Sequence, residues 1–86
     1  MRTPVRYSAP VSLFNERIDV RTTSSGRPSL FAWRGRLYRV QRVIGHWEGE
    51  VDLVRVAAES DQGEPSIADI SVDHATEDWT MRRHWS

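Results

Sequence analysis

The segment at residues 31–40, with the sequence FAWRGRLYRV, constrains the fold of this 86-residue chain more than any other feature. Phe31 and Trp33 alternate with other residues on the way into a central Arg-Gly pair, and Tyr38 and Val40 alternate on the way out. Such period-two alternation on both sides of a glycine-containing turn is typical of a tight β-hairpin. One face of the hairpin is therefore apolar and the other is cationic. The motif indicates β structure, and it points to no particular reaction.

Runs of alternating or β-branched residues, separated by clusters of Gly, Pro, Ser and Asp, predict more strands on both sides of this hairpin. The third strand should bend at Gly45 or at a bulge close to it, and residues 66–77 also allow a helix. Short strands at turn-like intervals predict an all-β antiparallel meander, either a strongly twisted sheet or a small SH3-like barrel. Six strands are expected, at residues 17–22, 30–33, 36–44, 53–58, 67–72 and 79–85.

The last predicted strand carries large side chains along its whole length. Simple alternation assigns these side chains to two opposite faces. One face is expected to hold Trp79, Met81, Arg83 and Trp85, and the other Thr80, Arg82 and His84.

A chain of this length buries only roughly 60 to 65% of the surface that its unfolded state exposes. Large rings bury on the order of 150 to 250 Å² each, so we expect a core that is more aromatic than aliphatic. At least three of five rings should be buried, with Trp47 or Trp85 the ones left exposed. The five rings are Trp33, Tyr38, Trp47, Trp79 and Trp85.

The formal net charge is zero, but the charges are unevenly distributed along the chain. Residues 1–46 hold nine arginines against two acids, a charge of +7, and residues 47–86 hold three arginines against ten acids, a charge of −7. All twelve basic residues are arginine. Arginine binds phosphate and carboxylate groups through a planar, bidentate guanidinium, although a GC-rich genome would enrich arginine in the same way.

Several classes of site have no support in the sequence. The chain has no cysteine, which excludes disulfides, thiolate metal ligands and cysteine nucleophiles. His46, His74 and His84 lack zinc-ligand spacing, and the five glycines form no phosphate-binding loop. No apolar run approaches the roughly 20 residues that span a bilayer, and the N-terminus leads into no signal segment. We expect a cytoplasmic, non-enzymatic protein with no catalytic residue, metal, cofactor or membrane partner.

A cluster of carboxylates in the second half is the one indication of metal binding or acid–base chemistry. No other residue pattern supports that interpretation, so a solvated face, or a surface that meets a basic partner, is favoured. The acids are Glu48, Glu50, Asp52, Asp69, Asp73, Glu77 and Asp78.

Residues 1–14 contain two prolines and little periodicity, which predicts a flexible N-terminal arm or an irregular edge segment. Residues 15–86 are then a single small β domain. Within the arm, Ser12, Leu13 and Phe14 resemble the end of the peptide type that docks into the bacterial sliding clamp, although the glutamine expected two residues earlier is missing. The alternative is that Leu13 and Phe14 fold back onto the sheet.

The hairpin motif F-x-W-R-G-R-x-Y-x-V is accompanied by further residues at set places, namely Gly26-Arg27-Pro28, Trp47, Ile67-x-Asp69, Asp73-x-Ala75-Thr76, Trp79 and Trp85. Together they resemble an uncharacterised small actinobacterial domain family. Its members stand alone or are attached to the C-terminus of certain Y-family translesion DNA polymerases. The resemblance covers roughly residues 17–86 and departs from the family pattern at Leu53, Ile70 and Met81, where aromatic residues are usual. It implies a DNA repair or translesion context, without implying an activity.

We expect a small binding module. Arginines on or near the cationic face of the hairpin suit a nucleic-acid backbone, and a tryptophan adds a ring on which a base can stack. DNA or RNA is one expected partner; the alternative is a replication or repair protein, or a second copy of the chain, recognised through complementary basic and acidic surfaces. Cross-strand pairing of the arginines with acids such as Asp69 or Glu48 would remove them from either role. The candidate contact residues are Arg34, Arg36, Arg39, Arg42 and Trp47.

Overall fold

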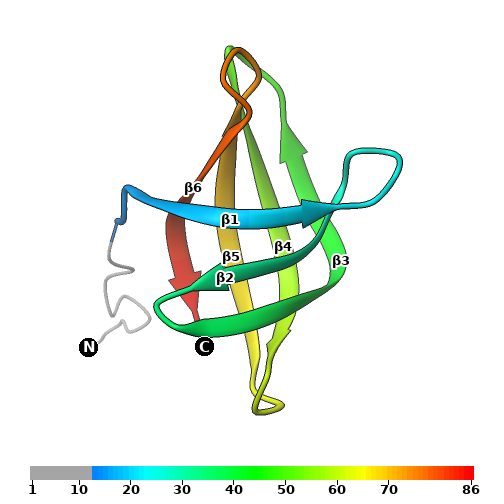
Figure 1. Cartoon of the computed structure of the whole chain (residues 1–86), viewed down its shortest axis with the longest axis vertical. Coiled ribbons are helices and arrows are strands. Elements are labelled where there is room, and N and C mark those ends of the chain that lie inside the picture. The colour runs from blue at the N-terminus through cyan, green and yellow to red at the C-terminus, as the bar shows by residue number, and fades with distance from the viewer. Residues whose placement is uncertain (1–12) are drawn as a thin grey trace, which may run out of the picture.

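Figure 1 shows the computed structural model, which describes residues 13–86 as six β-strands joined by short turns. Of the expected N-terminal arm, only Leu13 and Phe14 fall within the described residues. The strands are β1 (Glu16–Thr22), β2 (Pro28–Trp33), β3 (Arg36–Trp47), β4 (Val51–Ser60), β5 (Pro65–Asp73) and β6 (Asp78–Trp85).

The six strands form a closed antiparallel barrel. Each strand pairs with the next along the chain, and β1 also pairs with β6. In Figure 1, β1 crosses in front of β5 and β4 at a steep angle, as expected of opposite walls of a small barrel with tilted strands. Closure removes the exposed strand edges that an open sheet would present. Residues 13–86 include no helix long and apolar enough to cross a membrane.

The predicted all-β meander is confirmed in its closed, barrel form. All six predicted strands are present, and the observed strands extend one to three residues beyond the predicted ends in most cases. The helix considered for residues 66–77 is absent, because most of that segment is β5, which pairs with β4 and β6.

The hairpin that joins β2 to β3 has the two-residue turn that the motif predicted. Trp33 pairs with Arg36, and both central residues have positive φ, 50° at Arg34 and 77° at Gly35. This conformation matches the right-handed twist of the flanking strands, and glycine adopts it without steric cost. Arg34 lacks that freedom and must be held by contacts of its side chain.

Three strands contain extra residues that reverse the alternation of side chains. The register between β1 and β2 shifts between Arg21 and Thr22, which leaves Ser29 of β2 as an extra residue. The register between β3 and β4 shifts twice, between Val40 and Arg42 and between Val43 and Gly45, which confirms the expected irregularity near Gly45. The register between β5 and β6 shifts opposite Asp69 and Ile70. Each bulge adds an unpaired residue, so every later side chain on that strand changes face.

The bulge in β6 makes the predicted faces of that strand wrong. Met81 pairs with Ile70 and points into the barrel, whereas Arg83 pairs with Asp69 and Trp85 with Ile67, both on the outer face. Consequently His84 turns inward beyond the bulge, and Arg83 and Trp85 turn outward. Local alternation failed here because Arg82 occupies the extra position.

The core contains fewer rings than the sequence suggested. Among residues 13–86, ten apolar residues are buried, of which three are aromatic, namely Phe31, Trp33 and Tyr38. Of the five predicted rings, Trp33 and Tyr38 are buried, Trp79 and Trp85 are partly buried, and Trp47 is 50% exposed. The expectation of at least three buried rings is therefore wrong, because the inward positions of β4 and β5 are filled by small aliphatic side chains such as Val56 and Ala68.

The two ends of the barrel are filled differently. At the end formed by the β2–β3 and β4–β5 turns, the rings of Trp33, Tyr38 and His84 pack together, and we call this the aromatic end. The opposite end, formed by the β1–β2, β3–β4 and β5–β6 turns, is lined by valines and Trp79, and we call it the open end. Between the two ends, Phe31 stacks on Tyr38 with ring centroids 4.9 Å apart.

Candidate functional site

Arg34, the first predicted contact residue, is fixed at the aromatic end by its own neighbours. Its Nη2 donates to Glu16 Oε2 at 2.6 Å and its Nε donates to Glu16 Oε1 at 3.1 Å. The guanidinium also lies 4.7 Å from the ring centroids of both Phe14 and Trp33. The hydrogen bonds from Arg34 and from Trp33 Nε1 lower the pKa of Glu16, and those to Glu16 raise the pKa of Arg34. These contacts hold the positive φ of Arg34 and engage its charge internally.

Arg36 also lies near an acid at the aromatic end. Its Nη1 is 4.0 Å from Asp61 Oδ1, at the outer limit of an ion pair, and both side chains are about half-exposed. Arg34 and Arg36 therefore do not form a shared basic patch with the other predicted residues.

Arg39 and Arg42 remain accessible on the outer face of β3. Arg39 pairs across the sheet with Glu59, and Arg42 pairs with Ala57. Both are exposed, and within residues 13–86 neither has an ion-pair partner. Two of the four predicted arginines are thus free to meet a partner.

The antiparallel register extends these positions into rows across the outer face of four strands. Because facing residues on adjacent strands lie on the same side of a sheet, each row brings together residues that are far apart in sequence. One row is Arg42, Ala57, Ile67 and Trp85. The next row is Gly45, Arg55, Asp69 and Arg83.

The second row holds a buried carboxylate between two arginines. Asp69 is fully buried and accepts hydrogen bonds from Arg55 Nε at 2.7 Å and Arg55 Nη2 at 3.0 Å. Arg83 Nη1 donates to the same carboxylate at 3.3 Å. The bidentate pair fixes the plane of the Arg55 guanidinium and raises the pKa of Arg55. One net positive charge remains on this row.

Two tryptophan rings flank Arg55. Its guanidinium lies 5.5 Å from the ring centroid of Trp47 and 5.1 Å from that of Trp85. Trp47 reaches this place because Gly45 has no side chain: a Cβ there would lie 2.7 Å from Cη2 of the Trp47 ring. Half of the surface of Trp47 stays exposed, so the ring is held from one side and open to solvent on the other.

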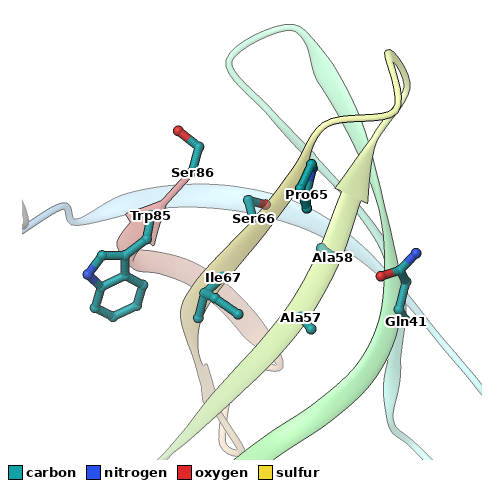
Figure 2. A pocket seen from close by; sticks show the side chains of 8 residues that line it. All are labelled: Gln41, Ala57, Ala58, Pro65, Ser66, Ile67, Trp85 and Ser86. Carbon is teal, nitrogen blue, oxygen red and sulfur yellow. The ribbon is translucent and has the colours of Figure 1, made fainter.

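A shallow apolar depression adjoins the Trp85 ring. It has a volume of about 320 Å³ and lies across β3 to β6, with Trp85 and Gln41 on opposite sides and Ala57 and Ile67 between them (Figure 2). The small side chain of Ala57 leaves the space that larger residues would fill. We call the surface around this depression the Trp-Arg face and define it as Arg42, Trp47, Arg55, Arg83 and Trp85.

The acidic residues of the second half do not form one site. Asp69 is paired with two arginines, and Asp52 accepts hydrogen bonds from His46 and His74 at the open end. Asp78 pairs with Arg17. No group of three or more potential metal ligands is assembled within residues 13–86.

The described part of the predicted clamp-type peptide is divided between solvent and barrel. Leu13 is 73% exposed. Phe14 packs edge-on against Trp33 with ring centroids 5.2 Å apart, and its N–H donates to the carbonyl of Arg82 at 2.8 Å. Ser12 lies outside the described residues. Phe14 alone therefore follows the alternative in which this segment folds back onto the barrel.

The family profile of a domain of unknown function, DUF6504, matches residues 4–86. The chain belongs to this family. No curated protein and no solved structure matches the chain. Membership of DUF6504 agrees with the expected resemblance to an uncharacterised family of small domains.

In this DUF6504 domain, sequence reasoning missed three members of the Trp-Arg face. Arg55, Arg83 and Trp85 were not among the predicted contact residues. Arg55 and Asp69 have opposite charges and lie on strands that are consecutive in the chain. Their pairing could have been predicted if the β4–β5 register had been known. Arg83 and Trp85 gave no such signal, because the bulge at Arg82 decides which face they occupy.

Proposed function

We propose that this chain is a cytoplasmic, non-enzymatic module that binds single-stranded nucleic acid through the Trp-Arg face. The observation that carries the proposal is the arrangement of Trp47 and Trp85 on either side of Arg55, on an outer face that also presents Arg42 and Arg83. Exposed rings on a positively charged sheet are the usual means of binding unpaired nucleotides without sequence preference.

The depression beside Trp85 suits one unpaired base. Its floor is the Ala57 methyl group and one wall is the Trp85 ring, so a planar base inserted there would stack on indole and bury apolar surface. Base–aromatic stacking contributes about 1 to 3 kcal/mol per base. Duplex bases are already stacked on one another, so the depression favours single strands.

The charge of the face suits a phosphate backbone. Arg42 neighbours Ala57 in the same cross-strand row, and Arg39 lies three residues before Arg42 on β3, on the same face because of the bulge between them. Asp69 neutralises only one of the two arginines that it contacts. Arg42 and Arg39 are therefore the phosphate ligands of the proposal, and the fixed Arg55 serves mainly to hold the two tryptophan rings in place.

The resemblance to actinobacterial domains attached to Y-family polymerases supports a role in DNA repair or translesion synthesis. In that setting, single-stranded template next to a lesion is the natural ligand for such a face. Arg34 and Arg36 are assigned no contact, since both lie near acids at the aromatic end.

The test is fluorescence anisotropy with a labelled single-stranded oligonucleotide and its duplex at about 50 and about 200 mM salt. Single strands should bind more tightly than the duplex, with a steep loss of affinity as salt rises. Arg42→Ala should lower affinity and reduce the salt slope by about one. Trp85→Ala should lower affinity about tenfold or more while leaving the slope unchanged.

Two further variants make the result specific. Arg21→Ala removes an equal charge from β1, which lies across the barrel from β4, and should leave the salt slope unchanged. Gly45→Ala displaces the Trp47 ring without touching a charge and should weaken binding moderately. Absence of single-strand binding at the lower salt, or equal effects of Arg21→Ala and Arg42→Ala, would overturn the proposal.

A protein partner is the second candidate, favoured by a specific observation. Three large apolar side chains about half-exposed to solvent, Ile44, Trp47 and Val51, lie close together in sequence on the β3–β4 hairpin. Recognition through such anchors would depend little on salt. Self-association through opposite charges is less favoured, since Arg17–Asp78 and Arg36–Asp61 already join the basic and acidic parts within one chain. A mass that rises with concentration and falls with salt would reverse that judgement.

A further inference from the structure

The open end of the barrel contains a cavity that shares no residue with the Trp-Arg face. Its volume is about 710 Å³, within the roughly 300 to 1,000 Å³ of pockets that hold small organic molecules. The mouth of a β-barrel is a usual place for such a pocket. A ligand there would be independent of nucleic acid on the outer face.

The inner part of the cavity wall is apolar, and the polar side chains lie at its mouth. Apolar side chains from β1, β3, β4, β5 and β6 line this inner part, one from each of these strands. The space exists because four of these side chains are valines, whereas the aromatic end is filled by rings. Trp79 supplies one large ring at the wall, and the five residues are Val20, Val43, Val54, Val72 and Trp79.

Two imidazoles at the mouth are held by one buried carboxylate. The Asp52 side chain is only 8% exposed, and its Oδ2 lies 2.9 Å from His46 Nε2 and 3.0 Å from His74 Nε2. The N–H of Gly49 donates to Oδ1 at 3.2 Å. The hydrogen bonds from His46 and His74 lower the pKa of Asp52 to about 2, so the carboxylate has no proton to give at neutral pH.

This arrangement decides which ring nitrogens are acceptors. Because the ionised carboxylate of Asp52 only accepts, each imidazole must donate its Nε2–H to it, and Nδ1 of each neutral ring is then an acceptor. His46 and His74 are 48% and 62% exposed, which leaves both rings accessible at the mouth. The pair therefore favours a ligand that carries hydrogen-bond donors.

The charged groups at the mouth favour a cation. Glu77 lines the cavity together with Asp52, against one cationic side chain, Arg27. A cation near the Trp79 ring would also gain from the negative face of the indole. An anion would meet two carboxylates and a single guanidinium.

We propose that the open end of the barrel binds a small organic amine. Its aromatic or branched body would fill the valine-lined cavity against Trp79. Its ammonium group would donate to the imidazoles of His46 and His74 and to the Glu77 carboxylate.

The experiment compares ligands of one shape and different charge. Phenethylamine, 2-phenylethanol and 3-phenylpropionate are titrated to about 10 mM into the ¹⁵N-labelled full chain, and amide and indole N–H shifts are recorded. The amine should give saturable shifts at His46, His74 and Glu77 and at the indole N–H of Trp79, with affinity at least tenfold above that of the carboxylate. Equal shifts with both ions, or none with the amine up to about 10 mM, would overturn the proposal.

Matched variants separate the site from bulk charge. Glu77→Gln removes the rim carboxylate, and Glu64→Gln makes the same change in the β4–β5 turn at the opposite end of the barrel. The first should weaken amine binding about fivefold and the second should leave it unchanged; equal effects would contradict the proposal. Glu77→Gly gives a second check on a folded protein, because φ at this position is 61°, which glycine adopts readily.

Discussion

The two ends of this barrel are built from the same alternating strands, but their interiors are filled to different extents. At the aromatic end, the ring of Trp33 lies with its centroid 6.4 Å from that of Tyr38 and 4.7 Å from that of His84. At the open end, Trp79 stands beside a cavity of about 710 Å³. Rings from three strands close one end, whereas valines cannot span the other.

The polar groups follow the same division. Glu16 at the aromatic end is bound to Trp33 and Arg34 of the same chain, so its charge serves to fix side chains. Asp52 at the open end instead holds His46 and His74, whose rings remain about half-exposed. The comparison indicates that the aromatic end contributes stability, while the open end leaves polar groups accessible to solvent.

The largest expected effect is the difference between two tryptophan truncations. Trp33→Ala removes a ring that is 8% exposed, together with its hydrogen bond to Glu16, and should cost about 3 to 5 kcal/mol of unfolding free energy. Trp79→Ala removes a ring that is only partly buried and lines a cavity, and it should cost about 1 to 2 kcal/mol. Urea unfolding followed by circular dichroism measures both.

Trp33→Phe is the control for this pair. It keeps a six-membered ring at the aromatic end but loses the fused five-membered ring with its N–H donor to Glu16, so its cost should fall between those of the two alanine variants. Losses of equal size from Trp33→Ala and Trp79→Ala would show that the two ends share the stability evenly, and would contradict the comparison.

Much of this architecture was predictable, because the signals that specify it are local. The F-x-W-R-G-R-x-Y-x-V motif predicted the β2–β3 hairpin, and turn residues separated the six strands. Closure into a barrel was one of two alternatives, since the β1–β6 pairing joins residues more than sixty positions apart. No local pattern specifies such a contact.

The surface was less predictable than the fold, because it depends on register. Arg42 and Trp47 were expected to contact a partner and lie on the Trp-Arg face, while Arg34 is engaged by Glu16. Arg83 is brought to the face only by the extra residue in β6. One inserted residue moves every later side chain to the other face, so a sequence read without its partner strands cannot place them.

The second prediction is that the two ends lose stability over different ranges of pH. Burial lowers the pKa of His84 at the aromatic end below its ordinary 6.5. The unfolded chain therefore binds this proton first, and stability that is complete above pH 6.5 falls as the pH drops below that value. At the open end the pKa of Asp52 is lowered from 3.8 to about 2, so its contribution is present above pH 3.8 and is lost only between there and about pH 2.

Thermal unfolding from about pH 8 to about pH 2 measures both windows. His84→Leu should remove most of the dependence of Tm on pH just below pH 6.5. Asp52→Asn should reduce the dependence of Tm on pH below pH 3.8. The pKa of Glu16 is also lowered, so Glu16 contributes to the loss of stability below its ordinary pKa of 4.5. The loss of stability at acid pH should therefore be smaller in Asp52→Asn without disappearing. An upper slope that survives in His84→Leu would assign that window to another group.

The smallest expected effect is the change in Tm when glycine replaces a residue with positive φ. One such residue lies at each end. Glu77 has φ of 61° and Arg34 has φ of 50°, a conformation that costs a non-glycine residue about 1 to 2 kcal/mol. Glu77→Gly removes that strain and loses no hydrogen bond of the side chain among residues 13–86. It also makes the unfolded chain more flexible, at a cost of about 0.5 to 1 kcal/mol. The net gain should be up to about 1 kcal/mol, or about 4 to 8 °C in Tm.

Arg34→Gly relieves the same kind of strain but gives up the bidentate contact with Glu16 and the stacking on Phe14 and Trp33. Its Tm should therefore stay level or fall. If both variants gained equally, the contacts of Arg34 would contribute nothing to the folded state. Arg34 would then be a surface charge, and the assignment of the aromatic end to stability would rest on its rings alone.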